Sequence, residues 1–136
     1  MVKMILVSHG NLAEAMLKSA QMIVGHQEEG MVTLGLQPGE SPDELQDEIE
    51  SALKNFGSDE ILLMSDLISG TPFNVAGSLM QKYKFRHICG FNLAMLLEAL
   101  MLRGTLPVDE LCESILSAFS ASVLDVNTLL DEQEQG

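Results

Sequence analysis

Two side chains capable of acid–base and nucleophilic chemistry stand where apolar runs of the sequence end. His9 follows residues 4–7 and precedes a small polar turn, and Asp66 follows residues 61–64. An imidazole can serve as nucleophile, proton carrier or metal ligand, and a carboxylate that accepts a hydrogen bond from one ring nitrogen orients the other. If the two side chains meet, they form an oriented histidine nucleophile.

Whether they meet depends on the fold. Strand and helix patterns alternate along the whole chain, which predicts a doubly wound α/β fold with a mostly parallel sheet. In the common strand order 2-1-3-4, the first and third strands are neighbours, about 4.8 Å apart, and a crevice opens between their carboxyl ends. Because His9 and Asp66 follow these two strands, we expect their side chains to lie within reach of each other.

Backbone N–H groups are predicted to surround the same edge of the sheet. Gly10 and Asn11 precede one helix, and Gly70 and Thr71 precede another. The N-termini of helices stabilise anions, phosphate among them, because their first N–H groups have no partner within the helix. We therefore expect both turns to bind a phosphoryl group carried by His9.

The expected elements follow from hydrophobic periodicity and from helix start signals. Strands are predicted at residues 2–7, 31–36, 60–65 and 87–91, and helices at residues 12–24, 42 onward, 72 onward, 94–102 and 109–121. Ser41 is expected to cap the second helix, with Pro42 at its first position, and Thr71 to cap the third. The helix at 94–102 is apolar nearly all round, which favours a subunit interface or deep burial in the monomer. Residues 123–126 alternate like a last strand.

Length and composition limit the classes of protein. The 136 residues suffice for one domain, assigned to residues 1–130, followed by an acidic tail at 131–136. A net charge of −13 argues against nucleic-acid binding, and the one basic cluster, at residues 82–86, is expected to be a solvated loop. No secretory signal is evident, and the longest apolar stretch is about half of the roughly 20 residues that span a bilayer. We therefore expect a cytoplasmic protein.

The remaining histidines and the two cysteines have no such neighbours. His26 is predicted in a surface loop and His87 at the start of the fourth strand. Cys89 and Cys112 match no zinc or redox spacing, so both are expected to be free thiols. No metal-ligating cluster is evident, and no cofactor is expected.

Four segments in the same order resemble the enzyme IIA domain of the mannose family of the bacterial sugar phosphotransferase system. They are Ser8-His9-Gly10, Pro38-Gly39-Glu40-Ser41, residues 66–74, and Gly90-Phe91-Asn92 followed by Met95-Leu96. The resemblance implies that His9 accepts a phosphoryl group on Nε2 from the histidine-containing phosphocarrier protein, while Asp66 holds Nδ1–H. It also implies a phosphotransferase that passes the group to a separate IIB subunit and serves the membrane components IIC and IID indirectly.

The same resemblance bears on assembly and on one loop. It implies a homodimer in which a C-terminal strand, about residues 122–128, is exchanged between subunits and runs antiparallel to the rest. The family often has two glycines before the Thr/Ser-Pro pair, whereas this chain has Ser69-Gly70. The backbone N–H of Ser69 remains available to the phosphate, and its hydroxyl adds a polar group.

Other functions fit parts of the pattern. A receiver domain also has an aspartate after its third strand, but it needs acidic residues after its first strand to hold magnesium, where this chain has Ser8 and His9. A histidine phosphatase would want arginine in place of Ser8, and a tetrapyrrole chelatase would want a second metal-facing histidine. The main alternative is a regulatory phospho-acceptor module of the same fold without a transport role.

Overall fold

Four short apolar strands form a parallel sheet at the centre of the molecule. The computed structural model describes residues 1–135, and its strands are β1 (Lys3–His9), β2 (Met31–Leu36), β3 (Ile61–Ser65) and β4 (Arg86–Cys89). Their order is β2-β1-β3-β4, with every pair parallel, which confirms the expected order. The two central strands are apolar on both faces because helices cover both sides of the sheet.

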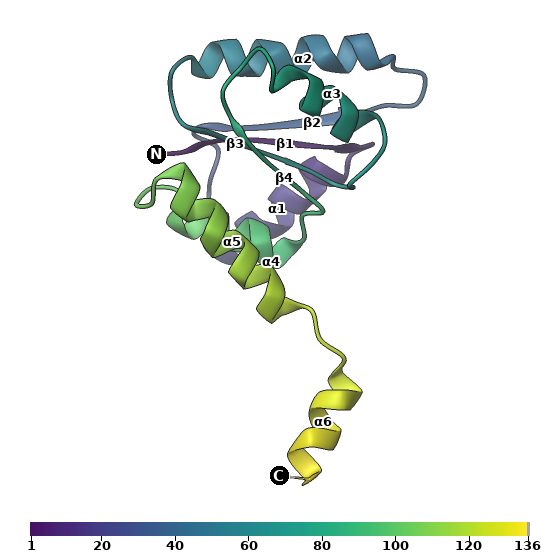
Figure 1. The fold of residues 1–136 in the computed structure, drawn as a ribbon, viewed down its shortest axis with the longest axis vertical. Helices are drawn as coiled ribbons and strands as arrows, with labels where there is room; N and C mark the ends of the chain where they lie inside the picture. The colour runs from purple at the N-terminus through teal and green to yellow at the C-terminus, as the bar shows by residue number, and fades with distance from the viewer. Residues whose placement is uncertain (136) are drawn as a thin grey trace.

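Within residues 1–135, six helices accompany the strands. They are α1 (Leu12–Val24), α2 (Pro42–Phe56), α3 (Thr71–Leu79), α4 (Leu93–Leu102), α5 (Val108–Ser122) and α6 (Val126–Gln135). Helices α2 and α3 cover one face of the sheet, and α1, α4 and α5 lie on the other (Figure 1). Each face has its own buried apolar cluster, so β1 and β3 are fixed between two layers of packed side chains. This sandwich sets the positions of the residues that follow both strands.

The starts of the helices show which local signals the chain uses. Ser41 Oγ accepts a hydrogen bond from the N–H of Glu44 (3.2 Å), and Pro42 is the first residue of α2, as expected. Thr71, in contrast, does not cap α3: it is already helical, and Gly70 stands at the N-cap without a side-chain bond. The tight turn after Asp66 needs a positive φ at this point, which glycine adopts readily. The prediction of a Thr71 cap was therefore wrong.

The apolar helix α4 is buried within the chain itself. It packs against α5 and α1, and its residues Met95, Leu96, Ala99 and Leu100 are buried. Met101 is the exception, with 68% of its surface exposed. Deep burial therefore accounts for most of the apolar circumference of α4. No helix among residues 1–135 is both long enough and apolar enough to cross a membrane.

The C-terminal segment differs from the expected strand. Residues 123–125 have no regular structure, and α6 follows them, extending away from the sheet and the other helices (Figure 1). None of the residues of α6 is buried. Because a strand needs a neighbour for its backbone hydrogen bonds, alternation alone does not produce one in a segment that pairs with no strand of its own chain. Residues 131–135 of the expected acidic tail are helical, and Gly136 lies outside the described residues.

Candidate active site

His9 and Asp66 meet at the carboxyl edge of the sheet. His9 is the last residue of β1, and Asp66 follows β3, whose Ser65 pairs with Val7. The backbone N–H of His9 donates to Oδ2 of Asp66 at 2.9 Å, and the same oxygen lies 2.8 Å from His9 Nδ1. The contact expected from the strand order is present, and one carboxylate oxygen fixes both the main chain and the ring of the histidine.

The two partners differ in exposure. The Asp66 side chain is 8% exposed, whereas 47% of the His9 side chain remains open to solvent. The other carboxylate oxygen, Oδ1, accepts the N–H of Leu67 at 3.0 Å, so the carboxylate itself is held in place. An ionised carboxylate only accepts hydrogen bonds, so the proton of a neutral His9 ring belongs on Nδ1. Nε2 then presents its lone pair on the side of the ring away from Asp66.

The N-terminus of α3 lies beside this free nitrogen. A Cβ built on Gly70 would stand 3.2 Å from Cε1 and 3.3 Å from Nε2 of His9. Gly70 has a φ of +93°, so the backbone reaches the imidazole closely only because no side chain intervenes. Since no side chain caps α3 within the described chain, its first N–H groups remain available to an anion near Nε2.

The α1 turn contributes fewer donors than the sequence indicated. The N–H of Gly10 donates to the Leu36 carbonyl at 2.8 Å, and the N–H of Ala13 donates to the buried hydroxyl of Ser8 at 2.8 Å. β2 therefore already uses the Gly10 N–H in this arrangement, and the role of Gly10 in phosphate binding stays a prediction. The Asn11 side chain accepts a hydrogen bond from Gln37 Nε2 at 3.1 Å.

Gly35 of β2 is a further site residue that the sequence analysis missed. A Cβ at Gly35 would lie 1.8 Å from the Gly10 carbonyl oxygen, so only glycine lets the turn after His9 pack against β2. The signal was the glycine inside an otherwise apolar strand, which marks a close approach of backbone.

Acidic side chains occupy the other side of the turn. A cavity of about 270 Å³ is lined by Gly10, Asn11, Glu14, Thr33, Leu34, Gly35, Gln37, Glu40 and Glu48. Burial and the neighbouring Glu40 carboxylate raise the pKa of Glu48, and Glu40 Oε1 is buried without a hydrogen-bond partner among residues 1–135. Because carboxylates repel phosphate, an anion on His9 is favoured toward α3 rather than toward this cavity.

His87 is more than the start of a strand. Its Nε2 lies 2.8 Å from the hydroxyl of the buried Ser65, the residue before Asp66. Burial lowers the pKa of His87, so the ring is neutral near pH 7. His26, as expected, is an exposed loop residue. The sequence analysis missed the Ser65–His87 pair because the two residues are 22 positions apart and no motif near either one indicates the contact.

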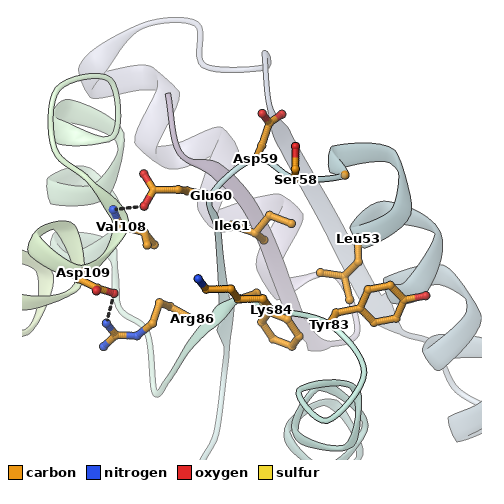
Figure 2. Close-up of a pocket in the computed structure, with 12 residues that line it drawn as sticks. Leu53, Ser58, Asp59, Glu60, Ile61, Tyr83, Lys84, Arg86, Val108 and Asp109 are labelled. Carbon is orange, nitrogen blue, oxygen red and sulfur yellow. Dashed lines mark hydrogen bonds and ion pairs between the residues drawn. The ribbon is translucent and has the colours of Figure 1, made fainter.

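A larger cavity, of about 390 Å³, lies at the opposite edge of the sheet, where β3 and β4 begin (Figure 2). Two of the charged side chains that line it contact α5: Arg86 pairs with Asp109, and Glu60 accepts the N–H of Val108 at 3.3 Å. Lys82, the first residue of the basic cluster, pairs with Glu50 at 3.3 Å. Neither histidine nor cysteine lines this cavity, so size alone does not identify the site, and the chemistry favours the edge that holds His9.

The two cysteines are free thiols, as expected. Cys112 is buried in α5 and Cys89 is half-buried in β4, and burial raises the pKa of the Cys112 thiol. A thiol with a raised pKa is a weak nucleophile at neutral pH.

Comparison with known proteins points to one family. Residues 3–116 match the family model EIIA-man, described as the fructose IIA component of the PTS. The chain is 32% identical over 117 residues to the fructose-specific EIIA component of Bacillus subtilis, covering 85% of this chain and 80% of that one. It is also 32% identical over 116 residues to the sorbose-specific EIIA component of Klebsiella pneumoniae, covering 85% and 84%. The crystal structure of phosphotransferase system component EIIA from Streptococcus agalactiae superposes with a TM-score of 0.87 at 34% identity, covering 94% of this chain and 99% of that one.

Proposed function

Because the chain belongs to the EIIA-man family, and is therefore a phosphoryl carrier of a sugar phosphotransferase system, we propose that His9 is the residue that carries the phosphoryl group. The observation that supports this most is the 2.8 Å contact between His9 Nδ1 and Asp66 Oδ2. It leaves Nε2 as the free nucleophile of a ring that is nearly half exposed to an incoming partner.

The transfer balances with two histidines and no other reactant. The Nε2 lone pair of His9 attacks the phosphorus of a phosphohistidine on the phosphocarrier protein, and a new N–P bond forms. The N–P bond of the donor breaks, and its electron pair returns to the donor imidazole. The proton on His9 Nδ1 stays in place throughout, and Asp66 stabilises the positive charge that the ring acquires. Donation to a histidine of a IIB component is the same step in the other direction.

The phosphoryl oxygens need donors, and we propose Ser69, Gly70 and Thr71 for that role, with Asn11 on the α1 side. The closeness of Gly70 to His9 Nε2 supports this assignment, as does the absence of a side-chain cap on α3. Phosphoryl transfer needs alignment and charge stabilisation more than covalent help, and a preformed set of N–H groups supplies both.

The surface around His9 suits a protein partner. Leu67 and Ile68, which directly follow Asp66, are 54% and 76% exposed. Apolar side chains that rim a reactive group are typical of a docking surface. We propose that they contact the phosphocarrier protein and the IIB component, and that the protein works in the cytoplasm in support of membrane components IIC and IID.

We also propose that the protein is a homodimer, in which residues 122–128 of one chain pair with the sheet of the other. Val123, Leu124 and Val126 are each more than half exposed, although they belong to the most apolar stretch after α5. A second chain would bury them, and β4, at the edge of the sheet, has a free side for pairing.

Phosphate-labelled peptide mapping tests the role of His9. Incubation with phosphorylated phosphocarrier is expected to label the peptide that contains His9 and no other, and His9→Ala is expected to abolish the label. His26→Ala, which removes an exposed histidine elsewhere, should label like the native protein. A His9→Ala protein that still takes up phosphate would overturn the proposal.

A further inference from the structure

His87 forms a hydrogen bond with the residue that precedes Asp66, the carboxylate that orients His9. Its Nε2 is 2.8 Å from the Oγ of Ser65, and Ser65 is wholly buried at the end of β3. The pair joins two neighbouring strands on the face of the sheet that α2 and α3 cover. Ser65 is buried and His87 is half-buried, and a hydrogen bond at such a site holds its geometry tightly, because leaving the buried hydroxyl without its partner is costly.

Ser65 transmits this restraint to Asp66, the next residue. The Ser65 carbonyl accepts the N–H of Gly90 at 2.8 Å, and it also lies 3.4 Å from the N–H of Phe91. The main chain of Ser65 is thus bound to the end of β4, and its side chain to the middle of β4. The backbone from which the Asp66 carboxylate projects toward His9 is fixed from that side.

The same imidazole reaches α3. The rings of His87 and Phe73 lie 5.4 Å apart between centroids, tilted by 42°. Phe73 belongs to the first turn of α3, three residues after Gly70, which approaches His9 Nε2. His87 therefore contacts two of the elements around His9: the end of β3 through Ser65, and the start of α3 through Phe73.

We propose that His87 is a positioning residue for the phosphoryl transfer: through Ser65 and Phe73 it sets the distance between the Asp66 carboxylate and the N-terminal turn of α3, and so the orientation of the His9 imidazole. This inference rests on the proposed function of His9. An aliphatic side chain would fill the same space, but it would offer Ser65 no hydrogen-bond partner. The hydrogen bond between Ser65 and His87 fixes the orientation of both side chains, in addition to the space that the imidazole fills.

Three variants separate positioning from mere packing. Ser65→Ala removes the hydroxyl alone. His87→Phe keeps a ring against Phe73 but cannot bond to Ser65, and His87→Gln restores a polar group at nearly the reach of Nε2. We expect Ser65→Ala and His87→Phe to lower kcat for transfer from phosphorylated phosphocarrier about 3- to 10-fold with an unchanged KM, and His87→Gln to recover to within about twofold.

The second readout does not depend on phosphate. In the unphosphorylated protein, the ¹⁵N and ¹H resonances of the His9 ring report the hydrogen bond from Nδ1 to Asp66. We expect them to shift in Ser65→Ala and His87→Phe, and to return toward the native values in His87→Gln. Thermal unfolding identifies any variant that does not fold, and Ser65→Ala, the smallest change, then decides the question.

The outcomes are distinct. Native kcat and native His9 resonances in folded Ser65→Ala and His87→Phe would overturn the inference, as would equal losses in His87→Phe and His87→Gln. Altered resonances together with a native protein that takes no phosphate on His9 would refute the proposed function and leave the positioning of the imidazole supported.

Discussion

Asp66 accepts both of its bonds from His9 through a single carboxylate oxygen: Oδ2 lies 2.9 Å from the backbone nitrogen and 2.8 Å from Nδ1 of the ring. His9 is therefore held at two points, its backbone N–H and the Nδ1 of its ring. A ring fixed in this way keeps one tautomer and one direction for Nε2, which is what an in-line attack on phosphorus requires.

Asp66→Ala is expected to slow phosphoryl transfer by about 10-fold or more, because the ring loses the partner that fixes its proton and its orientation. Asp66→Asn, which keeps an oxygen acceptor but lacks the charge, should fall between this variant and the native protein. Single-turnover rates with phosphorylated phosphocarrier measure the effect. Asp59→Ala, at an exposed carboxylate on the opposite edge of the sheet, is the control and should transfer normally. An Asp66→Ala protein as fast as the Asp59→Ala control would contradict the role of the carboxylate.

Gly70→Ala should impair both folding and transfer. Its φ of +93° is strained for alanine, and the new methyl group would stand 3.2 Å from His9 Cε1. We expect the free energy of unfolding to fall by about 1 kcal/mol and the transfer rate to drop several-fold as the methyl group displaces the imidazole or the phosphate.

Gly25→Ala separates the two effects. Gly25 has a similar φ of +85° at the end of α1, and a Cβ there would meet nothing within 4 Å. Urea unfolding should show a comparable loss of stability in both variants, while only Gly70→Ala loses transfer rate. Equal transfer rates in the two variants would argue against phosphate binding at the α3 turn.

Local signals predicted the four strands and the first five helices, and the usual strand order predicted the main contact of the site. The start of α2 was predictable because Ser41, Pro42 and Glu44 act within one turn of helix. The meeting of His9 and Asp66 was predictable because both follow central strands, and the order of such strands is restricted by general rules of parallel sheets. The apolar pattern and these rules together predict that both residues lie at one edge of the sheet.

Contacts that depend on long-range packing were not predictable. The Gly10 N–H is used by Leu36, and the hydroxyl of Ser65 by His87, across 26 and 22 residues. Neither contact follows from periodicity, because it depends on register and on which face each side chain takes. Thr71 has the residue type of an N-cap, but the turn needs a positive φ at Gly70. The helix therefore begins at Thr71, one residue earlier in the chain than predicted. The alternation at residues 123–126 describes a strand only if another chain supplies the neighbour.

The proposed dimer makes the oligomeric state a direct test of the C-terminal segment. Sedimentation equilibrium of the full chain is expected to give a dimer. Leu124→Asp is expected to shift the equilibrium toward monomer. Leu124 is 55% exposed in the single chain, and the dimer would bury the new carboxylate against the partner chain, which is costly. Gln133→Asp adds the same charge beyond the pairing segment and should remain dimeric. If the native protein sediments as a monomer at about 100 times the concentration used in the phosphoryl-transfer assay, the proposed exchange of residues 122–128 is refuted.

Glu40 and Glu48, which line the cavity beside the α1 turn, make the stability of the folded protein depend on pH. Burial, and then the nearby Glu40, raise the pKa of Glu48 above the value of 4.5 that it has in the unfolded chain. The folded protein therefore holds this proton more tightly, so the contribution to stability is fully present below pH 4.5 and is lost as pH rises through the folded pKa. Once both carboxyls are ionised, Glu48 and Glu40, which line the same cavity, repel each other.

Glu48→Gln should therefore raise the melting temperature at pH 7 and have little effect at pH 4, where the native side chain is protonated as well. A glutamine amide can also donate a hydrogen bond to Glu40, whose Oε1 is buried without a partner among residues 1–135. Glu110→Gln changes the net charge equally on the exposed face of α5 and serves as the control for the relief of general negative charge. If calorimetry from pH 4 to pH 7 gives the same shift for both variants at every pH, net charge explains the stabilisation and the pairing of Glu40 with Glu48 does not.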